Sequence, residues 1–300
     1  MNMVIKRVKR SKYLLLMFLL PALYFAIFKY GSMFGLMMAF KEYNPMLGMW
    51  KSPFTGFTYF REMFSDRWFY RVVVNTVILN LYLLVFYFWL PVILAILINE
   101  VRRKRFKKLI QSISYIPYFL STVVVAGMVT NILSSGGLVN QLLERFGQEP
   151  FMFMLEPGWF RWIYLFTVAW QNTGWDCIIF LAALTGIDEQ LYEVADLEGA
   201  GRLQKIRYIT LPSLIPIISI VFMLRIGQML SVGFERVLLL YNPSIYETAD
   251  VIQTYVYRRA IVQGDFSYGT AVDLASGVLA FVLIVITNKI SGKLEGSTLW

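Results

Sequence analysis

The sequence predicts an all-α membrane protein that crosses the bilayer six times and keeps both termini in the cytoplasm. Of its 300 residues, 58% are hydrophobic and only 16% are charged, against about 45–50% and about 25% in ordinary soluble domains. The apolar residues gather in long runs, and a bilayer core about 30 Å thick needs about 20 such residues per helix. A soluble core could not bury this much apolar surface, so the runs indicate transmembrane helices.

Six runs along the chain are predicted to span the membrane. They are residues 13–28, 72–98, 110–133, 162–184, 211–233 and 271–288. Basic residues before the first, Leu-rich run are also typical of a signal peptide. That run is long and has no convincing small-residue cleavage site, so an uncleaved span is favoured.

The short connecting segments predict the orientation of the spans. Lysine and arginine residues concentrate in segments 1–12, 102–108, 202–207 and 289–293, which all lie on one side if there are six spans. The positive-inside rule places that side in the cytoplasm. The cluster at 102–108 has a competing interpretation as a nucleic-acid patch, but a juxtamembrane, lipid-binding role is favoured. We therefore expect membrane lipid, and no nucleic acid, as a partner.

The composition excludes several chemistries. The chain has no histidine and a single cysteine, Cys177, so histidine-based catalytic sites, histidine metal sites, an internal disulfide and a zinc cluster cannot form. It also contains neither a GxxxxGK[ST] phosphate loop nor a GxSxG elbow. We expect no catalytic residue, no metal and no bound cofactor in this chain. Energy for any driven process would have to enter through another chain.

The loop between the fourth and fifth spans carries the most specific pattern, GIDEQLYEVADLEGAGRLQKIRYITLP. Apolar residues recur at helical spacing on both sides of Gly199, which predicts two short amphipathic helices on the inner face. Glycine has no Cβ and therefore tolerates the backbone angles of a sharp junction. On periodicity alone, this loop could simply be a hairpin that connects two spans.

The same residues resemble the EAA loop of permease subunits in binding-protein-dependent ABC importers. Seven positions match that pattern, namely Glu193, Ala195, Gly199, Ala200, Ile209, Leu211 and Pro212. Glu198 stands where the family usually has Asp, and Val194 stands where it usually has Ala. Neither departure removes the charge or the glycine.

The resemblance covers nearly the whole chain and points to the carbohydrate branch of these permeases. WQNTGWDCIIFLAALTGID, GFERVLLLYNP, DFSYGTAVDL and NKISGKLEGSTLW are similar to the oligosaccharide permeases of the maltose-importer type, and most of all to the polysaccharide-transport group of Gram-positive bacteria. Asp176 departs from this pattern, because a neutral residue is expected there. The resemblance implies an ABC importer permease fold with a basic N-terminus at 1–12, one transmembrane permease domain at 13–290, a coupling loop at 185–212 and a cytoplasmic tail at 291–300.

The resemblance also implies partners and a mechanism. Such importers contain two permeases, two ATPase subunits and an extracytoplasmic solute-binding protein, so we expect a second permease, usually a different protein, in a bacterial plasma membrane. ATP and magnesium would be used by the ATPase. Glu193 would meet a basic residue of the ATPase, and Leu197, Ala200 and Leu203 would supply apolar contacts. ATP-driven closure would then switch the cavity between its two access states.

Polar residues within the spans are candidates for the substrate pathway, because they are costly in a bilayer and tend to face the bundle interior. Aromatic faces beside amide groups also suit a sugar. The candidates are Trp170, Gln171, Asn172, Trp175, Asp176, Arg225, Gln228, Glu235 and Arg236. Alternatively, Asp176 and Arg225 pair with each other, or with the partner permease, as structural ions.

Two other classes of protein compete with this interpretation. A secondary transporter working without an ATPase would be expected to show inverted repeats and interrupted helices with ion-coupling acids. We find no convincing repeat, and six spans are few for that design. A membrane enzyme or channel subunit is disfavoured, because there is no nucleophile–base pair, metal cluster or selectivity-filter motif.

Overall fold

The computed structural model describes residues 12–227, 229 and 233–294 of the chain. In this described part the chain forms helices and loops, apart from an isolated antiparallel bridge between Lys41 and Phe54. The all-α prediction is therefore confirmed. Contacts between Cα atoms divide the chain into two compact units, residues 1–66 with 256–275 and residues 67–255 with 276–300.

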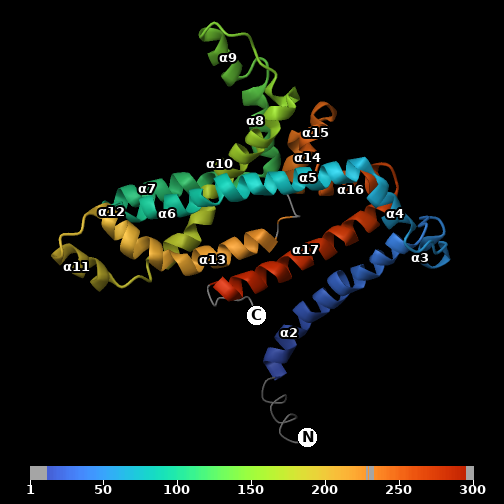
Figure 1. The fold of residues 1–300 in the computed structure, drawn as a ribbon, viewed down its shortest axis with the longest axis horizontal. Coiled ribbons are helices and arrows are strands. Elements are labelled where there is room, and N and C mark those ends of the chain that lie inside the picture. Colours follow the sequence, from blue (N-terminus) through green and yellow to red (C-terminus); the bar gives the residue numbers. More distant parts are fainter. Residues whose placement is uncertain (1–11, 228, 230–232, 295–300) are drawn as a thin grey trace, which may run out of the picture. The chain divides into compact units, whose positions relative to one another are not determined.

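Unit 1 contains the N-terminal helices and part of the C-terminal region (Figure 1). The Ser267 hydroxyl donates to the Lys41 carbonyl at 2.7 Å and accepts from the Tyr43 amide at 2.9 Å, which ties the two sequence segments of this unit together. Its helices are α2 (Lys12–Tyr24), η1 (Phe25–Tyr30), η2 (Gly31–Phe40), α3 (Gly48–Lys51), α4 (Thr58–Ser65) and η8 (Tyr257–Val262).

Unit 2 contains most of the predicted spans and the predicted coupling loop. Its helices are α5 (Arg67–Tyr82), η3 (Leu83–Tyr87), α6 (Trp89–Asn99), α7 (Lys104–Tyr115), η4 (Ile116–Phe119), α8 (Thr122–Leu133), α9 (Leu138–Arg145), η5 (Phe153–Leu155), α10 (Pro157–Leu184), α11 (Glu189–Leu197), α12 (Arg202–Lys205), η6 (Ile206–Thr210), α13 (Leu211–Gly227), α14 (Phe234–Leu240), η7 (Pro243–Ile245) and α15 (Tyr246–Ala249). Helix α16 (Ile252–Val256) lies at the boundary, and α17 (Phe266–Leu294) contributes residues to both units.

Helix α10 is the centre of unit 2. It contacts α5, α6, α7, α8, α13, α14 and α15. Two clusters of buried residues pack around it, one including Phe160 and Tyr164 and the other including Cys177 and Phe180. Lipid tails are as apolar as these side chains, so close packing and polar bonds hold such helices together within a bilayer.

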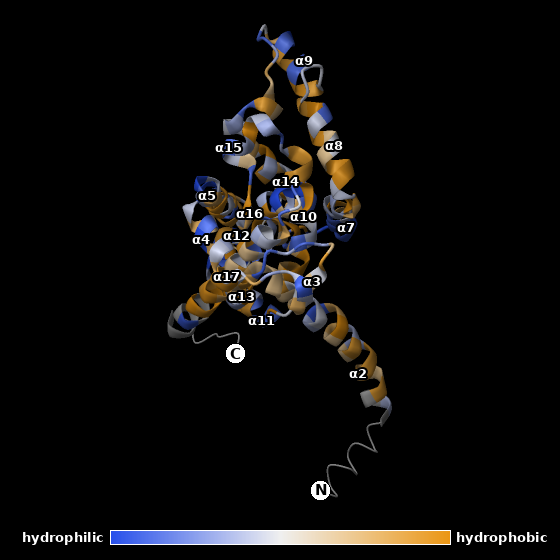
Figure 2. Cartoon of the chain, turned by 90° about the vertical axis from the view of Figure 1, so that its right-hand side faces the viewer, coloured by the Kyte–Doolittle hydropathy of each residue, from blue (hydrophilic) through white to orange (hydrophobic). Residues whose placement is uncertain are grey.

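Five stretches are long and apolar enough to cross a membrane, namely Leu16–Phe40, Arg67–Asn99, Thr122–Arg145, Arg202–Gly227 and Phe266–Ile286. Helix α10 has 28 residues, but Gln171, Asn172 and Asp176 lower its mean hydropathy. Candidate spans are thus present at five of the six predicted positions, although the one at the third position is shifted to Thr122–Arg145. The predicted fourth span, residues 162–184 in α10, remains a prediction. Hydrophobic residues dominate α2 and α8, whereas polar residues gather on α9 (Figure 2).

The predicted third span, residues 110–133, is not one continuous helix. Leu120 and Ser121 adopt extended backbone angles between η4 and α8. The Ser121 hydroxyl then caps α8 by accepting from the Val124 amide at 3.3 Å. Pro117 lies in η4 just before the break, and proline lacks the amide hydrogen that a continuing helix needs. The hydrophobic run alone did not reveal this interruption.

Candidate functional site

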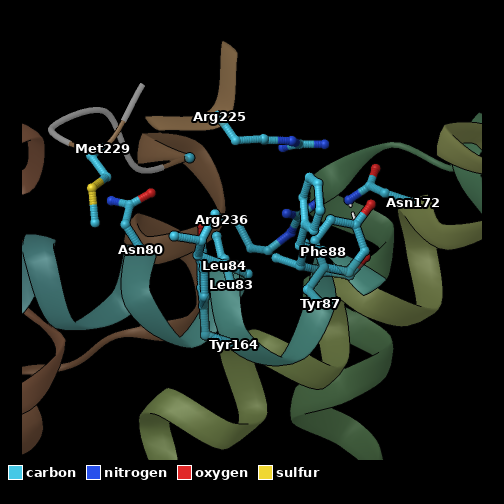
Figure 3. Close-up of a pocket in the computed structure, with 12 residues that line it drawn as sticks. Asn80, Leu83, Leu84, Tyr87, Phe88, Tyr164, Asn172, Arg225, Met229 and Arg236 are labelled. Atoms are coloured by element: carbon cyan, nitrogen blue, oxygen red, sulfur yellow. Dashed lines mark hydrogen bonds between the residues drawn. The ribbon is translucent and has the colours of Figure 1, made fainter. Parts of the chain in front are cut away.

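A polar cavity of about 320 Å³ opens in unit 2 among the helices α5, η3, α10, α13 and α14 (Figure 3). Its volume is at the lower end of the about 300–1,000 Å³ that is typical of ligand pockets. The wall combines arginine, amide and phenol groups with apolar side chains. It is lined by Asn80, Leu83, Leu84, Tyr87, Phe88, Tyr164, Val168, Asn172, Arg225, Met229, Gly233 and Arg236.

Tyr87 reaches this cavity from a distorted turn of the second span. Pro91 has no amide hydrogen for the Tyr87 carbonyl, and its ring clashes with that carbonyl in a regular helix. The preceding turn, η3, is a π-helical turn, in which the Phe88 amide donates to the Leu83 carbonyl at 2.9 Å. Such π-turns are frequent at functional sites.

Asp176 and Arg225, two of the sequence candidates, form an ion pair at the cavity. Arg225 Nη2 lies 2.6 Å from Asp176 Oδ2. The Tyr87 hydroxyl donates to the same oxygen at 2.5 Å, and the Arg225 guanidinium carbon lies 5.6 Å from the centre of the Tyr87 ring. The three residues therefore link η3, α10 and α13. The alternative in which Asp176 and Arg225 pair with each other is realised in this chain.

Gln171 and Arg236, two further candidates, form a second polar link. Arg236 Nη2 donates to Gln171 Oε1 at 2.5 Å. Gln171 is only 4% exposed, and its Nε2 donates to the Leu120 carbonyl at 2.9 Å. That carbonyl lies at the break before α8, so the buried amide both orients Arg236 and satisfies a backbone group that the interrupted helix leaves open.

The other candidates from the sequence are dispersed. Asn172 lines the cavity, and its Nδ2 donates to the Val168 carbonyl at 3.1 Å. Trp175 lines a second, adjacent cavity with Asp176 and stacks on Tyr118 at 4.4 Å between ring centres. Trp170 lines a separate apolar groove. Glu235 is exposed and does not line the polar cavity. Gln228 lies outside the described residues.

Sequence reasoning missed Asn80, Tyr87 and Tyr164 as lining residues. The run at 72–98 contains no charged residue, so its composition predicts only a transmembrane span. Asn80 and Tyr87 are seven positions apart, or about two helical turns, which places them on one helix face. A polar residue and a tyrosine at this spacing could have indicated a face turned toward the cavity.

The predicted coupling loop consists of two short helices that meet at Gly199, as the periodicity predicted. Gly199 has φ of +74°, a conformation that residues with a Cβ rarely adopt. Its amide donates to the Asp196 carbonyl at 3.1 Å, and the Ala200 amide donates to the Ala195 carbonyl at 2.8 Å. These two bonds form a Schellman cap. The spacing from Ala195 to Gly199 in the EAA pattern is thus the spacing of a helix terminus.

Polar contacts hold the two helices of the loop together. Lys205 pairs with Asp196 across the junction, and the Tyr192 and Thr210 hydroxyls lie 2.9 Å apart. The Gln204 side chain accepts from the Gly201 amide at 2.7 Å at the start of α12. The junction is therefore fixed by side chains as well as by the backbone cap.

Most of the predicted contact residues of the loop are open to a partner. Leu197 is 88% exposed and Leu203 is 80% exposed. Glu193, Glu198, Leu211 and Pro212 are exposed, and Ala195, Ala200 and Ile209 are partly exposed. Helices α11 and α12 project where α6 ends and α13 begins (Figure 1). Among the described residues, no group of three His, Cys, Asp or Glu side chains is placed to hold a metal.

Comparison with known proteins identifies the family. Residues 88–295 match the family model described as "Binding-protein-dependent transport system inner membrane component". The chain belongs to this family. It is therefore a transport component, and the predicted relationship to binding-protein-dependent permeases is confirmed.

Two relatives from Bacillus subtilis (strain 168) match this inner membrane component over nearly their full lengths. The polygalacturonan/rhamnogalacturonan transport system permease protein YteP is 41% identical, over 95% of this chain and 89% of YteP. Protein LplB is 41% identical, over 96% of this chain and 91% of LplB. The inner membrane component thus has close relatives among bacterial sugar-polymer permeases.

Two solved structures have the same fold as this inner membrane component. A chain of a bacterial ABC transporter involved in the import of the acidic polysaccharide alginate superposes with a TM-score of 0.91 and 40% identity, over 97% of this chain and 99% of that chain. A chain of a bacterial alginate ABC transporter in complex with alginate pentasaccharide-bound periplasmic protein gives 0.90 and 39%, over 98% and 99%. The ABC permease fold is therefore established.

Proposed function

We propose that this chain is one of two membrane-spanning subunits of an ATP-driven importer that carries an oligosaccharide or related sugar. Its family supports a role in binding-protein-dependent transport. The name of YteP and the description of the alginate transporter support a sugar polymer as the source of the substrate. The polar cavity in unit 2 would form this subunit's half of the pathway.

The loop around Gly199 carries the proposal. Two leucines with exposures of 88% and 80% stand on either side of a Schellman-capped junction. Exposed apolar groups on a rigid, capped hairpin are typical of a surface that a partner covers. A hairpin that only connects two spans would not need them. We assign this surface to a separate ATPase, with Glu193 meeting a basic residue there.

Movement of this loop would reach the cavity along one helical stretch. Residues Arg202–Gly227 form a stretch of 26 residues that begins in the loop as α12 and continues through η6 and α13. Arg225, near its far end, lines the cavity. ATP-driven closure of the ATPase would displace α12 and, through the stretch, Arg225. In this proposal the stretch would be the element with two arrangements that alternating access requires.

We further propose six spans, both termini in the cytoplasm and a bacterial plasma membrane as the location. In this arrangement α10 is the fourth span, and its polar residues are tolerated because protein surrounds it. The lone Cys177 is buried, which leaves a convenient background for cysteine labelling. In a Cys177→Ser chain, Gln141→Cys in α9 should react with an impermeant maleimide from outside the cell, whereas Lys107→Cys in α7 should react only after permeabilisation. The reverse pattern would invert the proposed orientation.

The remaining subunits follow from this proposal. A second permease, usually a different protein in such importers, would complete the pathway, and an extracytoplasmic binding protein would deliver the sugar. ATP and magnesium would bind to the ATPase, and we propose no cofactor in this chain. One of the alginate structures contains a periplasmic protein in complex with its transporter, which supports a partner of this kind.

Co-purification tests the proposal. The chain, tagged in its native membrane and extracted in mild detergent, should retain an ATP-binding subunit and a second permease that mass spectrometry identifies. Glu193→Lys should reduce recovery of the ATP-binding subunit and abolish ATP-driven uptake, while insertion stays normal. Glu144→Lys, in α9, is the matched control and should behave as wild type. Uptake that persists in Glu193→Lys, or a chain that is active alone, would overturn the assignment.

A further inference from the structure

The two arginines that line the polar cavity have unequal partners. Arg225 is paired with the Asp176 carboxylate at 2.6 Å. Arg236 donates instead to a neutral group, the Gln171 amide oxygen, at 2.5 Å. The Nε atom of Arg236 is buried and has no hydrogen-bond partner among the described residues. Figure 3 shows both arginines extending among the lining residues, with Asn172 on the side toward which Arg225 points.

The charges around the cavity do not balance. Two guanidinium groups, which stay protonated at all relevant pH values, meet one carboxylate, Asp176. Glu235 directly precedes Arg236 in the sequence, but its side chain is exposed and does not line the cavity. A partly buried charge without a counter-ion is unfavourable, because neutral hydrogen-bond partners such as Gln171 replace only part of the lost hydration. An anionic ligand would complete the set.

We propose that this cavity binds the carboxylate of an acidic sugar, such as a uronate unit, through Arg236 and Arg225. The inference rests on the proposed function, since it names the substrate class of the same pathway. Guanidinium matches carboxylate geometry with two parallel N–H donors. The amides of Asn80 and Asn172 and the Tyr87 ring suit the hydroxyls and the C–H face of a sugar ring.

Asp176 takes the place of the substrate carboxylate while the cavity is empty. The Arg225 and Asp176 side chains are 41% and 26% exposed, so water can compensate both when they separate. The Tyr87 ring remains under the Arg225 guanidinium, 5.6 Å from its carbon, and a cation–π contact of this kind keeps the arginine in position. Exchange of one carboxylate for another on Arg225 would let an acidic chain advance without leaving an unpaired charge.

The test uses the transporter purified through this chain and reconstituted in proteoliposomes. The probes are trigalacturonate and its fully methyl-esterified form, which has the same length but no charge. ATP hydrolysis is measured against the concentration of each probe, and binding is measured on the full chain alone in nanodiscs. Wild type should respond to the acid at a lower concentration than to the ester.

Substitutions of Arg236 and Asp176 should change the response to trigalacturonate and leave the response to its methyl ester unchanged. Arg236→Gln should raise the half-maximal concentration of trigalacturonate by about tenfold, the loss expected for one charge-assisted bond, and should leave the ester unchanged. Arg236→Lys keeps the charge and should retain part of the preference, which separates a charge effect from misfolding. Asp176→Asn frees Arg225 and should lower the concentration of acid required. Arg71→Gln is the control, because Arg71 is exposed, lies over Trp68 and does not line the cavity.

Three results would overturn the site. They are an equal response of wild type to acid and ester, an equal loss for both probes in Arg236→Gln, and a response only to a sulfated trisaccharide. ATP-driven import of neutral sugar without acid preference would reject the anion site and leave the proposed function standing. Acid-selective binding by a chain that retains no ATPase would support the anion site and reject the proposed ATP-driven function.

Discussion

Arg202, the first residue of α12, forms an ion pair with Glu100, the residue that follows α6. Its Nε lies 2.9 Å from Glu100 Oε2, and its Nη2 donates to the Glu100 carbonyl at 2.8 Å. The pair joins the coupling loop to the end of the span that carries Tyr87. We propose that this end lies on the cytoplasmic side. Loop and cavity are thus connected along two routes, one through α13 and the other through α6.

The first prediction concerns this ion pair. Arg202→Glu and Glu100→Arg should each reduce ATP-driven uptake several-fold by loosening the loop from α6. Neither should greatly affect stability, because an exposed pair contributes only about 0.2–1 kcal/mol. The double exchange, Glu100→Arg with Arg202→Glu, should restore much of the uptake. Uptake and thermal unfolding of the four proteins measure both effects. Full activity in the single variants would show that the α6 route does not contribute.

The second prediction concerns the junction at Gly199. A Cβ at this position would meet no atom within 4 Å, so steric contact with neighbours is not at issue. The backbone conformation is the obstacle instead, because the positive φ of +74° costs an L-residue about 1–2 kcal/mol. Gly199→Val should therefore abolish uptake while membrane insertion stays normal. Gly199→Asn should retain uptake, because asparagine adopts this conformation more readily. Equal uptake by the two variants would contradict the role of the backbone.

The third prediction concerns the two exposed leucines of the loop. Leu197→Asp and Leu203→Asp should leave the stability of the chain unchanged, because both side chains are largely exposed. Each should weaken retention of the ATPase, since burying a leucine at an interface contributes about 1.5–3 kcal/mol. Quantitative co-purification measures this loss. Leu138→Asp, at an exposed leucine of α9, is the control, and an equal loss there would indicate a nonspecific effect.

The fourth prediction concerns the contact between α7 and α10. A Cβ on Gly174 would lie 1.9 Å from the Ser114 carbonyl oxygen, and a backbone atom cannot move aside as a flexible side chain can. Gly174→Ala should therefore destabilise the chain by about 1–3 kcal/mol, as overpacking does. Gly127→Ala in α8 is the control, because its Cβ would meet nothing within 4 Å. Thermal unfolding in detergent should separate the two variants, and matching melting temperatures would contradict the close contact.

Local signals in the sequence predicted much of the fold and the form of the loop. Hydrophobic runs located five of the long helices, because a bilayer-spanning helix satisfies its own backbone and depends mainly on length and composition. The helix–glycine–helix pattern was also predictable. The bonds of its Schellman cap join residues only three and five positions apart, so neighbouring residues specify the backbone conformation at Gly199.

Only the tertiary structure decided which polar residues form the site. The bonds of Asp176 to Arg225 and to Tyr87 join residues 49 and 89 positions apart, and the bond between Arg236 and Gln171 joins residues 65 apart. No periodicity specifies such partners, because they depend on how separate helices pack. The break at Leu120–Ser121 is similar, since the buried Gln171 amide stabilises it from another helix. The sequence alone therefore determined most of the long helices and the form of the loop, whereas packing determined the break at Leu120–Ser121 and which arginine has a carboxylate partner.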